Sequence, residues 1–98
     1  MSSATMRPED QAFFDLVTRF LDEANALNDN GEHRSRISAA ILFAAARYNA
    51  FTWLHRDPST MPGQTEDEAV EFFANHYVTM LKDNLAFLRM LEGQEKPG

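Results

Sequence analysis

Three polar side chains interrupt apolar segments of the chain and together have the chemistry of an anion-binding site. Arg47 and Asn49 lie in its most apolar stretch, and Tyr77 lies further along. A guanidinium pairs strongly with a carboxylate or phosphate, and a few convergent polar groups orient a bound ligand. The alternative is structural: the stem of Arg47 covers the core, and its guanidinium ends in solvent or bonds to Asp15 or Glu71. The spacing leaves both interpretations open.

A second polar group consists of Asn25, Ser38 and Asn84, which fall at about one level when the helical segments are laid antiparallel. Buried amides and hydroxyls usually satisfy each other and fix the register of neighbouring helices. We therefore expect a structural role for these residues, with ligand contact as the alternative.

Three histidines are possible metal ligands, but their positions do not converge. His33 lies in the first connection and His55 at the end of the second helical segment, so a hairpin places them at opposite ends. Di-iron bundles use a Glu-x-x-His pair on each of two helices, and that spacing is absent. Glu71 precedes His76 by five residues, which points the two side chains in different directions. We expect no metal and no cofactor.

Nucleophilic catalysis has no support in the sequence. Cysteine is absent, which excludes thiolate chemistry and disulfides. No serine is framed by a tight glycine turn, and the four glycines are isolated, so no loop cradles a phosphate. The acidic residues Glu66, Asp67, Glu68 and Glu71 fit a helix start and a solvated face. We expect no catalytic residue.

Two helical segments are expected in the first half of the chain, over residues 8–28 and 35–55. Pro8 suits a first helical position, and the sequence Asn-Asp-Asn-Gly at 28–31 ends the first segment with turn chemistry. Ser35 or Ser38 is the expected cap of the second segment. That segment is apolar on almost every side, which is typical of a helix buried on most faces.

A third segment, over residues 66–92, has the best start signal. Thr65 and Glu68 have the spacing of a capping box, and Gly93 is the expected stop. Residues 56–63 contain two prolines and a glycine and cannot be helical throughout. The tails, 1–7 and 93–98, are expected to be flexible.

The segments predict an all-α fold, an antiparallel three-helix bundle in a single domain over residues 1–98. No strand alternation or internal repeat is present, and short connections suit antiparallel neighbours. Too many large apolar side chains compete for one interior, namely Phe14, Leu21, Phe43, Trp53, Phe72 and Phe87. We therefore expect a second copy to complete the bundle as a homodimer. The alternative is that the excess apolar surface stays exposed, which is common.

Composition excludes two classes of partner. The 98 residues carry nine basic and fifteen acidic side chains, a net charge of -6. Nucleic acids and anionic membranes both attract clustered cations, and the chain has no basic stripe. It also shows neither a signal-peptide pattern nor an apolar run of the roughly 20 residues that a membrane span needs. We expect an acidic cytoplasmic protein.

A distinctive segment lies at residues 38–51 and has the sequence Ser-Ala-Ala-Ile-Leu-Phe-Ala-Ala-Ala-Arg-Tyr-Asn-Ala-Phe. It resembles the signature of an uncharacterised bacterial family, domain of unknown function 3144. Two further segments fit this family, Phe13-Phe14 with Ala24-Asn25, and Tyr77 through Met80-Leu81 to Asn84-Leu85. The resemblance implies a small all-helical bacterial protein and leaves the activity open.

Two functional hypotheses follow. The first is a non-enzymatic, self-associating interaction module, with docking of another protein as a further option, because apolar helix faces are in surplus and no reactive group is assembled. The second is a small-ligand binder or an unrecognised enzyme. Its pocket would be lined by Tyr48, Trp53 and Tyr77, with Arg47 and Asn49 orienting the ligand.

Overall fold

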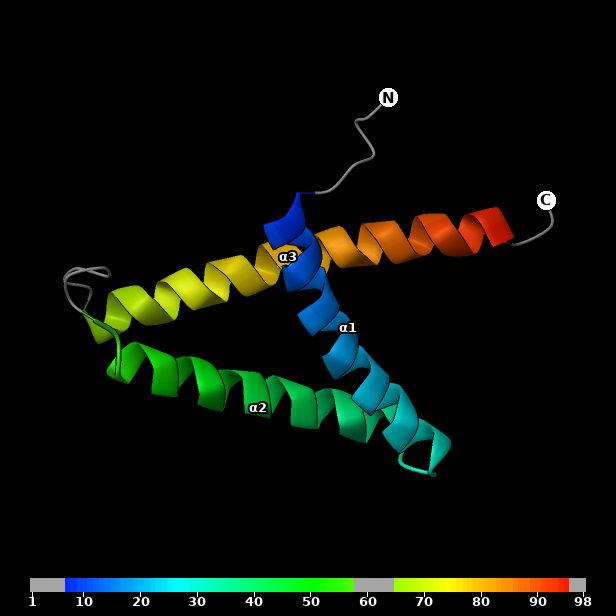
Figure 1. The fold of residues 1–98 in the computed structure, drawn as a ribbon, viewed down its shortest axis with the longest axis horizontal. Coiled ribbons are helices and arrows are strands. Elements are labelled where there is room, and N and C mark those ends of the chain that lie inside the picture. Colours follow the sequence, from blue (N-terminus) through cyan, green and yellow to red (C-terminus); the bar gives the residue numbers. More distant parts are fainter. Residues whose placement is uncertain (1–6, 58–64, 96–98) are drawn as a thin grey trace. The chain divides into compact units, whose positions relative to one another are not determined.

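Three α-helices account for the described part of the chain (Figure 1). The structure is a computed structural model and describes residues 7–57 and 65–95. The helices are α1 (Pro8–Asp29), α2 (Arg34–Leu54) and α3 (Glu66–Glu95). Within these ranges no strand is present, so the all-α class is confirmed.

Helix α1 ends in a Schellman motif. The amide of Glu32 donates to the carbonyl of Leu27 at 3.1 Å, and the amide of Gly31 donates to the carbonyl of Asn28 at 3.0 Å. Gly31 has φ +105°, a backbone conformation that residues with a Cβ rarely adopt. The predicted turn at 28–31 is therefore confirmed, with glycine at the position that requires it.

Helix α2 begins one residue earlier than expected, and neither predicted serine caps it. The carbonyl of His33 accepts hydrogen bonds from the amides of Arg36 and Ile37, each at 3.0 Å. Since the helix starts at Arg34, His33 has the capping position, and both Ser35 and Ser38 lie inside the helix. The assignment of a serine cap is wrong because the tight turn at Gly31 lets the next helix start at once.

Helix α3 begins with the predicted capping box. The amide of Glu68 donates to Oγ1 of Thr65 at 3.1 Å, and the amide of Thr65 donates to Oε1 of Glu68 at 2.9 Å. The helix continues through Gly93 to Glu95, past the expected stop. A glycine within a helix lowers the stability of the helix only modestly. To end the helix at this position, the glycine would need a left-handed conformation.

The chain divides into two units, Met1–Phe51 and Thr52–Gly98. The first contains α1 and most of α2, and the second contains the end of α2 and α3. A single bundle over residues 1–98 stays a prediction. Residues 1–6, 58–64 and 96–98, which include most of the expected tails and of the proline-containing connection, lie outside the described residues.

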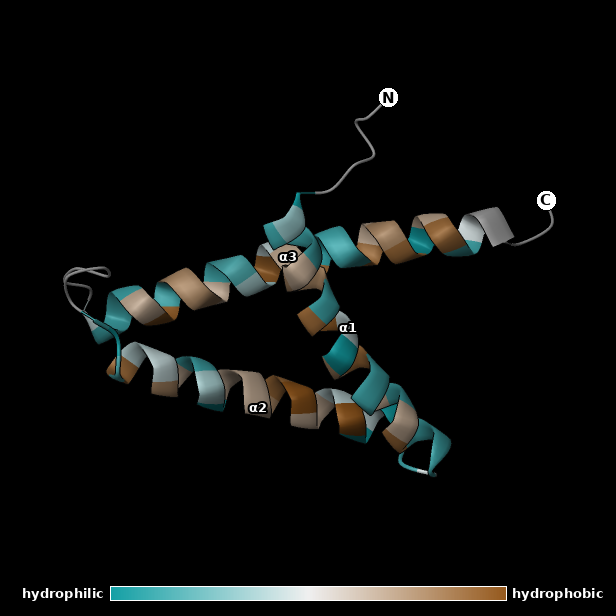
Figure 2. Ribbon diagram, in the orientation of Figure 1, coloured by the Kyte–Doolittle hydropathy of each residue, from teal (hydrophilic) through white to brown (hydrophobic). Residues whose placement is uncertain are grey.

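Large apolar side chains are exposed on every helix, and Figure 2 shows hydrophobic bands along all three. Among the described residues, the buried hydrophobic side chains are Ile37 and Ala69, at 8% and 5% exposure. The large hydrophobic side chains that are at least 40% exposed include Phe13, Phe20 and Leu21 on α1, Leu42, Phe43 and Tyr48 on α2, and Met80, Phe87 and Leu88 on α3. Folding of an isolated chain is driven by removing such surface from water, so these faces need cover.

Candidate functional site

Arg47 lies on the exposed surface of α2, and its guanidinium carbon is 5.1 Å from the centre of the Phe43 ring. This cation–π contact links residues one helical turn apart. Asp15, one of its two candidate partners, instead accepts a hydrogen bond from Gln11 on its own helix at 2.9 Å. The stem of Arg47 therefore covers an aromatic side chain, and no carboxylate of α1 or α2 neutralises its charge.

Asn49 and Tyr77, the other candidate ligand-binding residues, lie in different units. Asn49 is half-buried on α2. Because it follows Arg47 by two residues, the two side chains leave the helix in widely different directions. Tyr77 is 45% exposed on α3. The anion-site hypothesis, which needs all three residues to converge, stays a prediction.

The proposed register group also spans both units. Asn25 and Ser38 are exposed on α1 and α2. The amide nitrogen of Asn84 donates to the carbonyl of Met80 at 2.8 Å, within α3. That bond uses one donor of Asn84 and leaves its second N–H and its carbonyl oxygen for another partner.

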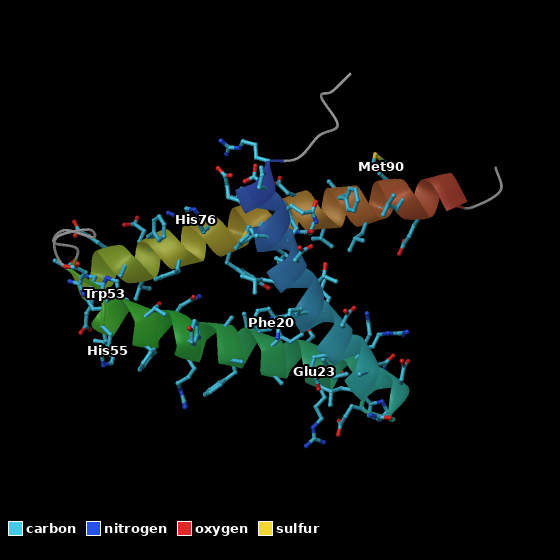
Figure 3. All side chains as sticks on the ribbon, in the orientation of Figure 1. Phe20, Glu23, Trp53, His55, His76 and Met90 are labelled. Atoms are coloured by element: carbon cyan, nitrogen blue, oxygen red, sulfur yellow. The ribbon has the colours of Figure 1, made fainter. Side chains whose placement is uncertain are left out.

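The histidines occupy three different environments. The backbone of His33 starts α2, His55 follows the end of α2, and His76 packs against Phe72 with ring centres 4.3 Å apart (Figure 3). The described residues contain no group of three or more potential ligands placed to hold a metal ion.

A cluster that sequence reasoning missed lies at the carboxyl end of α2, where Figure 3 labels Trp53. The guanidinium carbon of Arg56 is 3.9 Å from the centre of the Trp53 ring, and an Nη1–H of Arg56 donates to the carbonyl of Trp53 at 2.9 Å. The indole N–H of Trp53 is buried and meets no acceptor among the described residues. The i, i+3 spacing of tryptophan and arginine was the signal that could have revealed this contact.

The apolar surface of α2 extends around the helix. Ile41, Leu42 and Phe43 are consecutive, at 49%, 54% and 64% exposure. Because each residue advances the helix by about 100°, these three alone span roughly 200° of its circumference. One neighbouring helix cannot cover such an arc, so α2 needs several neighbours.

Aromatic rings add large exposed area to these faces. Phe13 and Phe14 meet edge to face with centres 5.2 Å apart, and Tyr48 stacks on Phe51 with centres 6.3 Å apart. Such pairs prearrange rings within one helix, and a partner that covers them gains their burial without ordering them first.

No helix in the described part of the chain is long and apolar enough to cross a membrane. The fold and its exposed faces thus define a small all-α protein with apolar helix surfaces.

The chain belongs to a family of proteins of unknown function, DUF3144, whose model matches residues 13–87. This match confirms the resemblance carried by residues 38–51. No curated protein and no solved structure matches the chain.

Proposed function

We propose that this chain is a non-enzymatic helical module that associates with a second copy of itself. The observation that carries the proposal is the apolar circumference of α2, together with the exposed stripes of the other helices. Three helices that close as an antiparallel bundle give α2 two neighbours. The arc of roughly 200° spanned by Ile41, Leu42 and Phe43 alone is about twice the width of the apolar stripe that is typical of a surface helix.

The exposed area on α2 supports a partner of ordinary size. Phe43, Tyr48 and Phe51 are 64%, 67% and 54% exposed. With about 200 Å² available to bury for each aromatic side chain, these three offer roughly 350 Å². A standard interface buries about 800 Å² of each partner, so three residues of one helix contribute a large share of what a stable homodimer needs.

The polar residues fit structural roles within this proposal. Asn25, Ser38 and Asn84 satisfy one another where the helices meet and set their register. A cytoplasmic location also fits, since the chain lacks the cysteines that small secreted domains commonly use as disulfides.

Thermal unfolding at different protein concentrations tests the proposal. A fold completed by association is stabilised by mass action, so we expect the unfolding temperature to rise over a hundredfold increase in concentration. An unfolding temperature that does not change over this range, with full helix content throughout, would reject self-association.

A second candidate, a small-ligand site around Arg47, Asn49 and Tyr77, is supported by Arg47, whose guanidinium meets no carboxylate of α1 or α2. Native mass spectrometry of protein purified from its own host is expected to show a retained anion if this candidate is correct. Arg47→Ala should then abolish the thermal shift that the anion produces, whereas Arg36→Ala, which removes an exposed arginine near the start of α2, should not. An equal thermal shift in wild type and Arg47→Ala would remove this candidate.

A further inference from the structure

The turn between α1 and α2 holds an asparagine followed directly by a glycine, Asn30 and Gly31. This pair is chemically reactive, because the backbone nitrogen of the second residue can attack the side-chain amide of the first and form a cyclic imide, a succinimide. Glycine allows the attack best, since it has no Cβ to shield its nitrogen. The other asparagines of the described chain precede residues that carry a Cβ, namely Ala26, Asp29, Ala50, His76 and Leu85.

Water reaches this turn. Asn30, Gly31 and Glu32 are all exposed. Among the described residues, nothing beyond the chain neighbours of Gly31 lies within 4 Å of the place that a Cβ on this glycine would take. The succinimide therefore has room to form, and the water that opens it again has access to it.

The closed turn holds the reacting atoms apart. Asn30 has ψ 7°, which turns the amide nitrogen of Gly31 toward the backbone nitrogen of Asn30. Tetrahedral geometry at Cα places Cβ about 120° away around the Cα–C bond, so the nitrogen of Gly31 must rotate by about that angle before it reaches Cγ of Asn30. The N–H of Gly31 also donates to the carbonyl of Asn28 at 3.0 Å, a bond that this rotation breaks.

Asn28 strengthens the closed turn with its side chain. An Nδ2–H of Asn28 donates to the carbonyl of Glu32 at 2.9 Å, across the two residues that react. The amide of Glu32 donates to the carbonyl of Leu27 at 3.1 Å. Each such bond favours the closed form modestly, and exposed segments open far more readily than a whole fold unfolds. The reactive form is therefore a small open fraction of the folded chain.

We propose that Asn30 is a modification site, which deamidates through a succinimide with Gly31 from the open form of the turn. The amide of Gly31 gives its proton to hydroxide, and its nitrogen bonds to Cγ of Asn30. The Cγ–Nδ2 bond breaks, and Nδ2 leaves as ammonia with a proton from water. Water then adds to one of the two imide carbonyls. Cleavage between the nitrogen and Cγ leaves aspartate, and cleavage at the main-chain carbonyl carbon leaves isoaspartate.

Both products weaken the turn in which they form. Each adds a carboxylate beside Asp29 and Glu32, at the end of α1 where the helix dipole is negative. No basic residue in the last turn of α1 offsets this charge. Isoaspartate also adds a carbon to the main chain, so the hydrogen bonds from Gly31 and Glu32 back into α1 lose their spacing. Modification thus loosens the connection between α1 and α2, whether or not the chain self-associates.

Peptide mapping by mass spectrometry tests the site, because it distinguishes asparagine, aspartate and isoaspartate. In the folded chain at mildly alkaline pH, isoaspartate should accumulate at Asn30 rather than at Asn49 or Asn84. The rate should be lower than in guanidinium chloride, where the turn is open throughout. Asn30→Gln is the matched control and should form no isoaspartate. Equal rates in the folded and unfolded chains would overturn the proposal, as would a folded chain that keeps Asn30 intact while the unfolded chain is fully converted.

Asn28→Ala tests the protection by the closed turn. It removes the hydrogen bond to the carbonyl of Glu32 and should raise the rate at Asn30 in the folded chain about fivefold. In guanidinium chloride the variant and the wild type should react at nearly one rate. Thr18→Ala removes a side-chain bond to the carbonyl of Phe14 within α1 and should leave the rate unchanged. An unchanged rate in Asn28→Ala, or equal acceleration by Thr18→Ala, would show that this turn does not control the reaction.

Asn30→Asp carries the charge of the aspartate product and tests the consequence. Chemical unfolding followed by circular dichroism should give an unfolding equilibrium constant about threefold larger than that of the wild type at low ionic strength. The difference should shrink as added salt screens the helix end. A variant as stable as the wild type at low ionic strength would overturn the proposed weakening of the turn.

Discussion

Single residues at the helix ends determine where this chain turns. Thr65 and Glu68 satisfy each other's backbone amides, and Gly31 has the positive φ that ends α1. Both features could be predicted because capping and turn chemistry depend on a few neighbouring residues. The start of α2 was less predictable, because His33, the residue before this helix, is not one of the residue types preferred as a helix cap.

Thr65→Ala should lower the free energy of unfolding by about 1 kcal/mol, because it removes the side-chain acceptor for the amide of Glu68. Thr79→Ala is the matched control, an exposed threonine inside the same helix, and should be neutral or slightly stabilising. Urea unfolding followed by circular dichroism measures both. An equal loss in the two variants would show that capping is not the cause.

Arg56→Ala should shift the fluorescence emission of the sole tryptophan to longer wavelength, because the guanidinium that covers the Trp53 ring is lost. Stability should fall by about 0.5–1 kcal/mol, the value of a partly exposed cation–π contact. Arg36→Ala, at an exposed site near the start of α2, should leave the emission unchanged. Unchanged emission in Arg56→Ala would contradict the contact.

At the scale of elements, the sequence predicts much of the fold. Helices expected over residues 8–28, 35–55 and 66–92 occur at Pro8–Asp29, Arg34–Leu54 and Glu66–Glu95. Apolar periodicity and start signals are local properties, so bounds within three residues were attainable. The site was less predictable, because spacing along a helix shows which way Arg47 and Asn49 leave it but not what they meet on another element.

The two described glycines should respond in opposite ways to alanine. Gly31→Ala forces a Cβ into a left-handed conformation and should cost about 1–2 kcal/mol. Gly93→Ala places a methyl group where nothing lies within 4 Å, inside α3, and should stabilise the helix by up to about 1 kcal/mol. Thermal unfolding of both variants checks the signs. A stabilising Gly31→Ala would contradict the assigned end of α1.

At the scale of the whole molecule, the main feature is the surplus of exposed apolar surface. Its source is visible in the sequence, since residues 41–43 occupy three directions on one helix. What covers that surface does not follow from periodicity, because intramolecular closure and pairing of two copies bury the same side chains. Membership of a family of unknown function does not decide between them. Whether the chain closes on itself or pairs with a second copy therefore depends on how many neighbouring helices α2 and α3 need.

Light scattering coupled to gel filtration measures the mass of the purified wild-type chain in solution. Repeated over a wide concentration range, it distinguishes intramolecular closure from pairing of two copies. Our account predicts a species with twice the 11.2 kDa mass of the chain that dissociates on dilution. A species of 11.2 kDa alone, even at the highest concentration, would contradict it.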